Sequence, residues 1–268
     1  MVLRYTVTVF LFIAVLLGTG PTSRLLAQDA NSPLGYQTRF PRIGFEGGMD
    51  LNKQDGVYRV GCGEFVGGSN ANIIFGLTWE KPFGEAFRAE VFGGYRQINL
   101  SDSYVTNEPS VIRTADGFVE SAIDYNNLGE AKFGYLFLQP TFKFYPVTWF
   151  YVGTGFNAGL NIAAKTRYTK DIITQAVTTQ DGSVVEAFYP SDESSNPHSK
   201  IFPEEEPATA SSLLFDPVGY AGFEFRFGRE FYMSPRVTYS IPLNPLVTDP
   251  ELKYSSLQIT LGIRYDLR

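Results

Sequence analysis

The chain has 268 residues, of which 44% are hydrophobic and 15% aromatic, and its formal net charge is −6. The negative charge argues against nucleic acid as a partner, and the single cysteine, Cys62, excludes an intramolecular disulfide and a cysteine metal cluster. The many phenylalanines, tyrosines and glycines favour strands and tight turns.

Residues 1–27 are predicted to be a signal peptide. Arg4 gives the positive start, an apolar run covers residues 7–18, and Ala27 offers a small residue at the cleavage point. The run is too short for a spanning helix, which needs about 20 residues. Residues 28–41 are predicted to form a short polar lead, and residues 42–268 one exported β domain.

Eight segments alternate apolar and polar residues with the period of two that is typical of a β-strand. The last segment is the clearest, because Leu257, Ile259, Leu261, Ile263, Tyr265 and Leu267 share one face and polar residues or glycine occupy the other. We predict strands over residues 42–51, 71–80, 86–100, 132–145, 149–163, 212–227, 231–241 and 257–268.

The predicted connections alternate in length. Short turns are expected at residues 81–85, 146–148 and 228–230, whereas the other connections are longer. Asp116-Gly117 and Asp181-Gly182 predict hairpins within two of the long ones. This alternation indicates an up-and-down barrel with both chain ends on one side.

Charged residues occupy the polar faces of the predicted strands at even spacing. Enclosed charges need partners, and the interior of an eight-stranded barrel is only just filled by side chains. We therefore predict a network of paired charges that plugs the lumen, with an open ion pathway as the alternative. Its members are Glu46, Asp50, Glu80, Arg88, Glu90, Arg96, Lys143, Glu224, Arg226, Arg236, Arg264 and Asp266.

Aromatic residues gather near the short turns and resemble an interfacial girdle. They are Trp79, Phe87, Trp149, Phe227 and Phe231, together with Phe83 and Tyr145.

In this architecture, residues 42–268 resemble the small outer-membrane β-barrel proteins of Gram-negative bacteria, the OmpA/OmpX class. The resemblance implies an all-β fold, an eight-stranded antiparallel up-and-down transmembrane barrel with long outward loops and short periplasmic turns. It also implies residence in the outer membrane after signal-peptide cleavage, with outer-membrane lipid around the barrel.

The last strand resembles the family's assembly signal at Thr260, Gly262, Tyr265 and Leu267. This resemblance implies recognition by the barrel-assembly machinery. Family members usually end on an aromatic residue, whereas this chain has Leu267 followed by Arg268.

Enzymatic activity is not expected. Lipid-modifying or proteolytic chemistry usually needs a histidine base near a nucleophile, and the only histidine, His198, lies in an acidic loop. Glu204, Glu205 and Glu206 could bind a divalent cation, but the prolines beside them favour a solvated acidic tract. We predict neither a metal site nor a cofactor.

The predicted function is that of a non-enzymatic outer-membrane barrel with a plugged polar lumen. Its long extracellular loops would serve surface interaction with an extracellular or envelope protein, or membrane integrity. The alternatives are an accessory barrel of a protein-secretion apparatus, a narrow channel, and a soluble lipocalin-like carrier, which would reverse the two faces.

Overall fold

A computed structural model describes residues 40–60, 63–83, 86–114, 117–174, 176–178, 182, 184–189, 198–207 and 209–267, without the side chains of residues 112–119. The predicted signal peptide, nearly all of the polar lead, Cys62, Asp116, Asp181 and Arg268 lie outside these residues. Within them, no helix is long and apolar enough to cross a membrane.

The described residues form fifteen β-strands, and eleven of them belong to one antiparallel sheet. The long strands of this sheet are β1 (Arg42–Gly56), β4 (Ser69–Phe83), β5 (Phe87–Thr114), β6 (Gly117–Val147), β7 (Phe150–Ile172), β11 (Leu213–Phe223), β13 (Phe231–Ser240) and β15 (Glu251–Asp266). The short ones are β10 (Ser199–Ile201), β12 (Phe225–Arg226) and β14 (Val247–Thr248). Separate hairpins are formed by β2 (Tyr58–Val60) with β3 (Gly63–Phe65), and by β8 (Ala176–Thr178) with β9 (Val184–Glu186).

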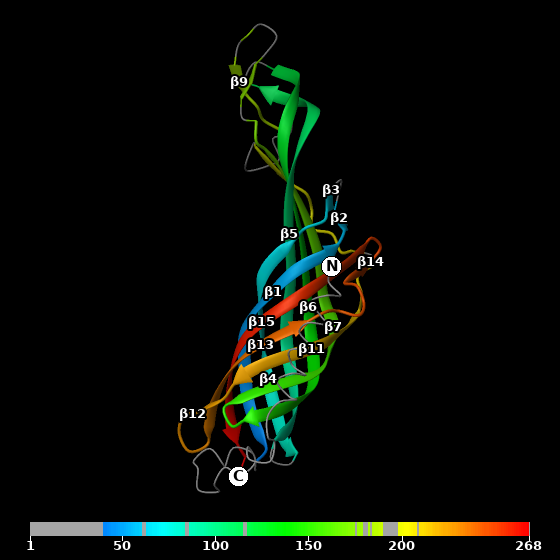
Figure 1. Cartoon of the computed structure of the whole chain (residues 1–268). Helices are drawn as coiled ribbons and strands as arrows, with labels where there is room; N and C mark the ends of the chain where they lie inside the picture. The colour runs from blue at the N-terminus through cyan, green and yellow to red at the C-terminus, as the bar shows by residue number, and fades with distance from the viewer. Residues whose placement is uncertain are drawn as a thin grey trace, which may run out of the picture. The chain divides into compact units, whose positions relative to one another are not determined.

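The sheet returns on itself, as Figure 1 shows. In chain order the eight long strands each pair with the next, and β15 pairs with both β13 and β1. At the seam, Arg42 lies opposite Asp266 and Leu51 opposite Leu257. We call this ring of eight long strands the closed sheet; none of its strands is left with a free edge along its whole length.

Each predicted strand has a counterpart in the closed sheet, but β5 and β6 are much longer than predicted. The segment of residues 101–127, which is predicted as a long connection containing a hairpin, instead continues both strands as far as that hairpin, where Thr114 lies opposite Gly117. The segment is rich in serine, threonine and asparagine, so it lacks the alternation that marks the other strands, yet its tyrosine, valine and isoleucine favour extended backbone.

The strand β7 also runs on, to Ile172, where residues 165–211 were expected to be an insertion. The hairpin predicted around Asp181-Gly182 is present, since Thr178 pairs with Val184 and Gly182 has a φ of 86°. Buried Ile123, Tyr125 and Val177 belong to one apolar cluster, which packs this hairpin against β6. We use the name extension for residues 101–114 of β5, residues 117–130 of β6 and residues 165–172 of β7, together with β8, β9 and β10 (Figure 1).

The outer surface of the closed sheet is apolar. Exposed and buried residues alternate along its strands, and the exposed ones are large and hydrophobic, such as Phe45, Leu77 and Ile259, which are 54%, 70% and 52% exposed. The apolar series of the last strand begins at Leu257 in β15 and ends at Leu267, just after it. Ten steps of about 3.3 Å make this series about 33 Å long along the strand.

Candidate functional site: the charged interior

The interior of the closed sheet is lined with charged side chains. Each of these residues is at most 2% exposed. Isolated buried charges are costly, so this arrangement requires close pairing. Among the described residues, the buried acids are Glu46, Asp50, Glu80, Glu90, Asp216, Glu224 and Asp266, and the buried bases are Arg42, Arg88, Arg96, Lys143, Arg236 and Arg264.

Arg264 lies at the centre of the largest group of ion pairs. Its guanidinium contacts Glu80 at 2.6 Å and both Glu46 and Glu90 at 3.1 Å. Lys143 bridges Glu80 and Glu90, and Arg236 bridges Glu46 and Glu90 at 2.5 Å each. The three glutamates therefore share their cations, and the group acts as one unit rather than as separate pairs.

A second group of ion pairs joins the first and the last strand of the closed sheet. Arg42 Nε donates to Asp266 Oδ1 at 2.7 Å, and Arg42 Nη1 donates to Glu224 at 2.8 Å. The same guanidinium lies 3.7 Å from the centre of the Tyr232 ring, whose hydroxyl donates to Asp266 at 3.1 Å. These contacts connect β1, β13, β15 and the segment after β11.

A third group is centred on Arg96. Its guanidinium donates to Asp50 and to Asp216, both at 2.8 Å. Asp216 also accepts hydrogen bonds from Tyr254 at 2.9 Å and Asn157 at 3.0 Å. We call Arg96, Asp50 and Asp216 the Arg96 triad; its two acids enclose one cation.

An apolar layer follows the Arg96 triad, at the end of the closed sheet away from the short turns. There β2 and β3 place Tyr58 and Phe65 inside, with ring centres 5.0 Å apart. Phe65 is fully buried and also packs against Tyr104 at 5.2 Å. Gln54 holds the hairpin by donating to the Phe65 carbonyl at 2.8 Å. This layer, the apolar cap, further comprises Val60, Ile98, Leu100, Ala131, Phe133, Tyr135, Tyr168, Leu214, Leu246, Val247, Leu252 and Tyr254.

The structure buries eleven of the twelve residues predicted to line the lumen and leaves Arg226 out. Arg226 lies in β12, beside the turn to β13, where it is partly exposed. Its guanidinium donates to the carbonyls of Gly228, at 3.0 Å, and of Arg229. At this end of the strand the side chain reaches the carbonyls of the turn, which offer acceptors without burial.

Two charged members of the interior were missing from the predicted set, Arg42 and Asp216. Both lie on the polar faces of predicted strands, in even register with Glu46 and with Glu224. The alternation alone was therefore a sufficient signal for including them.

The five aromatic residues predicted for the girdle all point outward near the short turns. Trp79, Phe87, Trp149, Phe227 and Phe231 are between 44% and 52% exposed. The prediction is wrong for Tyr145, because this residue is only 8% exposed and its hydroxyl donates to Glu224 at 3.3 Å. Its ring neighbours Tyr151 inside the closed sheet at 5.5 Å.

The residues of the predicted assembly signal lie on both faces of β15. Thr260 is buried and donates to Glu46 at 2.5 Å, and Gly262 faces the same carboxylate. Tyr265 and Leu267 point outward and are 37% and 39% exposed.

The residues considered for catalysis and cation binding lie just before and just after β10, against the extension. His198 contacts Glu186 at 3.2 Å and stacks on Phe188. Glu204 pairs with Lys165 at 3.0 Å and Arg167 at 2.9 Å, and the hydrogen bond from Lys165 lowers the pKa of its carboxyl. Among the described residues, no group of three or more histidine, cysteine or acidic side chains is placed to hold a metal ion.

No protein-family model and no curated protein sequence matches the chain. Solved structures do match. Ail of Yersinia pestis has 10% identity and a TM-score of 0.34, with 85% of this chain and 100% of that chain covered. The outer membrane protease OmpT of Escherichia coli has 7% identity and a TM-score of 0.34, with 85% and 97% covered. The outer membrane protein OprG of Pseudomonas aeruginosa has 12% identity and a TM-score of 0.32, with 86% and 99% covered.

The identities and TM-scores are low, and it is this chain's own strand pairings that close the sheet. Those pairings enclose a charged interior behind an apolar outer surface. In this arrangement the chain resembles the β-barrel proteins of the Gram-negative outer membrane, as its sequence indicated.

Proposed function

We propose that the chain is a non-enzymatic barrel of the Gram-negative outer membrane, whose plugged lumen supports an extension presented at the cell surface. In this proposal the closed sheet is an eight-stranded up-and-down transmembrane barrel with short periplasmic turns. The observation that carries the proposal is the interior, which is filled by paired charges and by the apolar cap.

The distribution of polarity supports a membrane location. A closed sheet satisfies its backbone hydrogen bonds internally, which a bilayer demands. An apolar series about 33 Å long, at the tilt of about 40° that barrel strands adopt, is long enough for the apolar band of about 25 Å of such barrels. Aromatic residues border the band at the short turns. A soluble lipocalin-like carrier would need the opposite arrangement, with its apolar side chains inside.

Two layers in series support a plug. The ion-pair groups of Arg264, Arg42 and Arg96 fill the half nearer the short turns, and the apolar cap fills the other end. Ions crossing the barrel would have to break several buried pairs and displace the cap. A narrow channel is therefore the weaker alternative.

The extension supports a role in surface interaction, because its strands are braced by contacts of their own. Lys170 donates to Glu108 at 2.6 Å across β5 and β7, and β10 pairs with β7. Extended segments on a rigid scaffold commonly carry the specificity of recognition. The proposed partner is an extracellular or envelope protein, and a role in a secretion apparatus is the second version of this idea.

We also propose that the last strand carries a signal for the barrel-assembly machinery. Tyr265 and Leu267 lie on the outer face of the last strand, accessible to the barrel-assembly machinery, while Thr260 and Gly262 face the charged interior.

Two measurements test the proposal. In planar bilayers the full chain should show no steady single-channel conductance; regular unitary currents would exclude the plug. A photo-crosslinking residue at Asn107, in the exposed part of β5, should capture an envelope or extracellular protein on intact cells. The control is the same residue at Ser234, which is buried in the lumen; equal products from both sites would contradict a role for the extension.

A further inference from the structure

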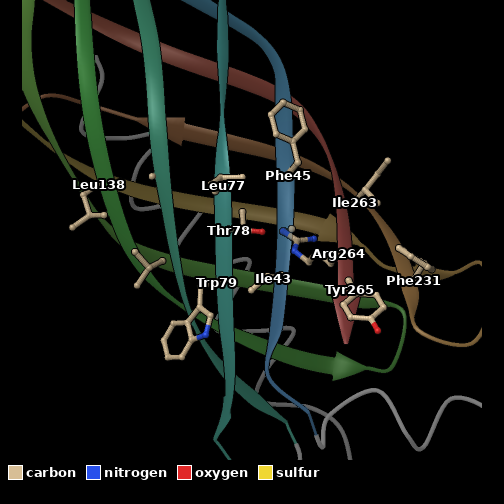
Figure 2. A pocket seen from close by; sticks show the side chains of 13 residues that line it. Ile43, Phe45, Leu77, Thr78, Trp79, Leu138, Phe231, Ile263, Arg264 and Tyr265 are labelled. Atoms are coloured by element: carbon tan, nitrogen blue, oxygen red, sulfur yellow. The ribbon is translucent and has the colours of Figure 1, made fainter. Parts of the chain in front are cut away.

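The apolar band contains an open groove that is lined by six strands near the short turns. It has a volume of about 760 Å³ and lies on the outer face of β1, β4, β5, β6, β13 and β15. Figure 2 shows two rows of outward side chains with the groove between them. One row consists of Ile263, Phe45, Leu77, Gly93 and Leu138, and the other of Phe231, Tyr265, Ile43, Trp79 and Val91.

Strand register explains the width of the groove. The two rows are two residues apart along each strand, which is about 6.6 Å. The residues between them, Gly44, Thr78 and Arg264, form a row of their own, in which Thr78 and Arg264 are buried and Gly44 has no side chain. The floor is therefore mostly backbone, and the walls are large apolar side chains.

Gly93 opens the groove at one point of its wall. It lies between Leu77 and Leu138 in the register, where both neighbours are large and exposed. The missing side chain leaves a notch beside Trp79. The next outward residue of β4 after Trp79 is Lys81, which is exposed at the edge of the band.

We infer that this groove is a binding site for one acyl chain of a periplasmic-leaflet phospholipid, whose phosphate lies near Lys81. The inference rests on the proposed membrane location. The groove is continuous with the apolar band that lipid would cover, large apolar side chains flank its backbone floor, and Lys81 lies two residues beyond Trp79, toward the edge where the headgroup lies. Acyl chains bind such surfaces through apolar burial alone.

The two tryptophans of the chain allow a direct test. Trp149→Phe leaves Trp79 as the only reporter in the groove, and Trp79→Phe leaves Trp149 as the reporter outside it. Each variant is titrated in detergent micelles with a phosphatidylcholine that is brominated on one acyl chain. Trp79 fluorescence should fall saturably at a low ratio of lipid to detergent, whereas Trp149 should show only a weak linear decrease.

Filling the notch provides the matched comparison. Gly93→Leu in the Trp79 reporter should abolish the saturable quenching; a Cβ at this position meets only the end of the Leu138 side chain at 3.3 Å and a backbone oxygen at 3.5 Å. Gly47→Leu, at an outward position of β1 beyond the row of Phe45, should leave the quenching unchanged. If Gly93→Leu does not fold, judged by its gel mobility without boiling, Gly93→Ala should give a partial loss.

The outcomes separate this inference from the proposed function. Linear quenching of both tryptophans, or saturable quenching that survives the Gly93 variants, would overturn the acyl-chain site. If neither tryptophan is quenched in vesicles made of the brominated lipid, the proposed membrane location itself is overturned.

Discussion

Arg42 and Asp266 lie 224 positions apart in the chain, and their side chains meet at 2.7 Å across the seam of the closed sheet. They are also directly opposite each other in the β1–β15 register. One ion pair thus joins the first strand to the last at the edge where the ring closes.

The first prediction concerns this seam. Arg42→Leu leaves Glu224 and Asp266 buried without their shared cation, and removing one partner of a buried pair costs about 3–5 kcal/mol of the free energy of unfolding. Asp266→Asn should cost clearly less, because Arg42 keeps Glu224 at 2.8 Å. Urea unfolding in lipid vesicles measures both. Equal losses for the two variants would show that the seam does not depend on the charge of Arg42.

The second prediction concerns the Arg96 triad. Arg96→Met alone leaves Asp50 and Asp216 facing each other without a cation, and should cost about 3–5 kcal/mol. The triple variant Arg96→Met, Asp50→Asn, Asp216→Asn removes all three charges and should recover most of that loss. The comparison uses the same unfolding measurement. If the triple variant is no more stable than Arg96→Met, the charges are not coupled and packing explains the loss.

Alternation predicted which residues face inward, because the side-chain period of a strand is two and a shift of one residue reverses both faces. This is why the eight long strands and nearly all interior charges followed from sequence, whereas the register that places Leu51 opposite Leu257 is found only in the structure. The same rule should have included Arg42 and Asp216.

Alternation does not predict which charges meet across the interior. Arg96 and Asp216 are 120 positions apart, and their contact depends on the tilt of the strands and on the relative height of each residue in the ring. Arg226 has the inward parity but lies beside the turn. The length of β5 and β6 was underestimated because their buried face in the extension includes polar Asn127 and Gly129 beside Ile123 and Tyr125, which weakens the hydrophobic period.

The third prediction concerns the apolar cap. A Cβ at Gly129 would lie 2.5 Å from the Phe65 ring and 2.6 Å from the Tyr58 hydroxyl. Gly129→Val should therefore displace the β2–β3 hairpin, at a cost of about 1–3 kcal/mol for overpacking. Limited proteolysis of the folded protein should then cut within residues 57–68, while the closed sheet stays intact.

Gly219→Val is the control for the cap, because a Cβ there meets nothing within 4 Å. This variant should keep the uncut pattern of the original chain. Cleavage of residues 57–68 in both variants, or in neither, would contradict the packing of β2 and β3 against Gly129.

The last prediction concerns pH and the extension. The hydrogen bond from Lys170 lowers the pKa of the Glu108 carboxyl from its ordinary value of 4.5, with help from Thr106. A carboxyl with a lowered pKa in the folded state stabilises that state above its unfolded-chain pKa, and this contribution disappears as the pH falls through the lowered value. Hydrogen-exchange protection of residues 101–114 should therefore be constant at neutral pH and decrease below about pH 4.5. Glu108→Gln should have lower protection at neutral pH and lose this pH dependence, so an unchanged acid transition in Glu108→Gln would assign it to another group.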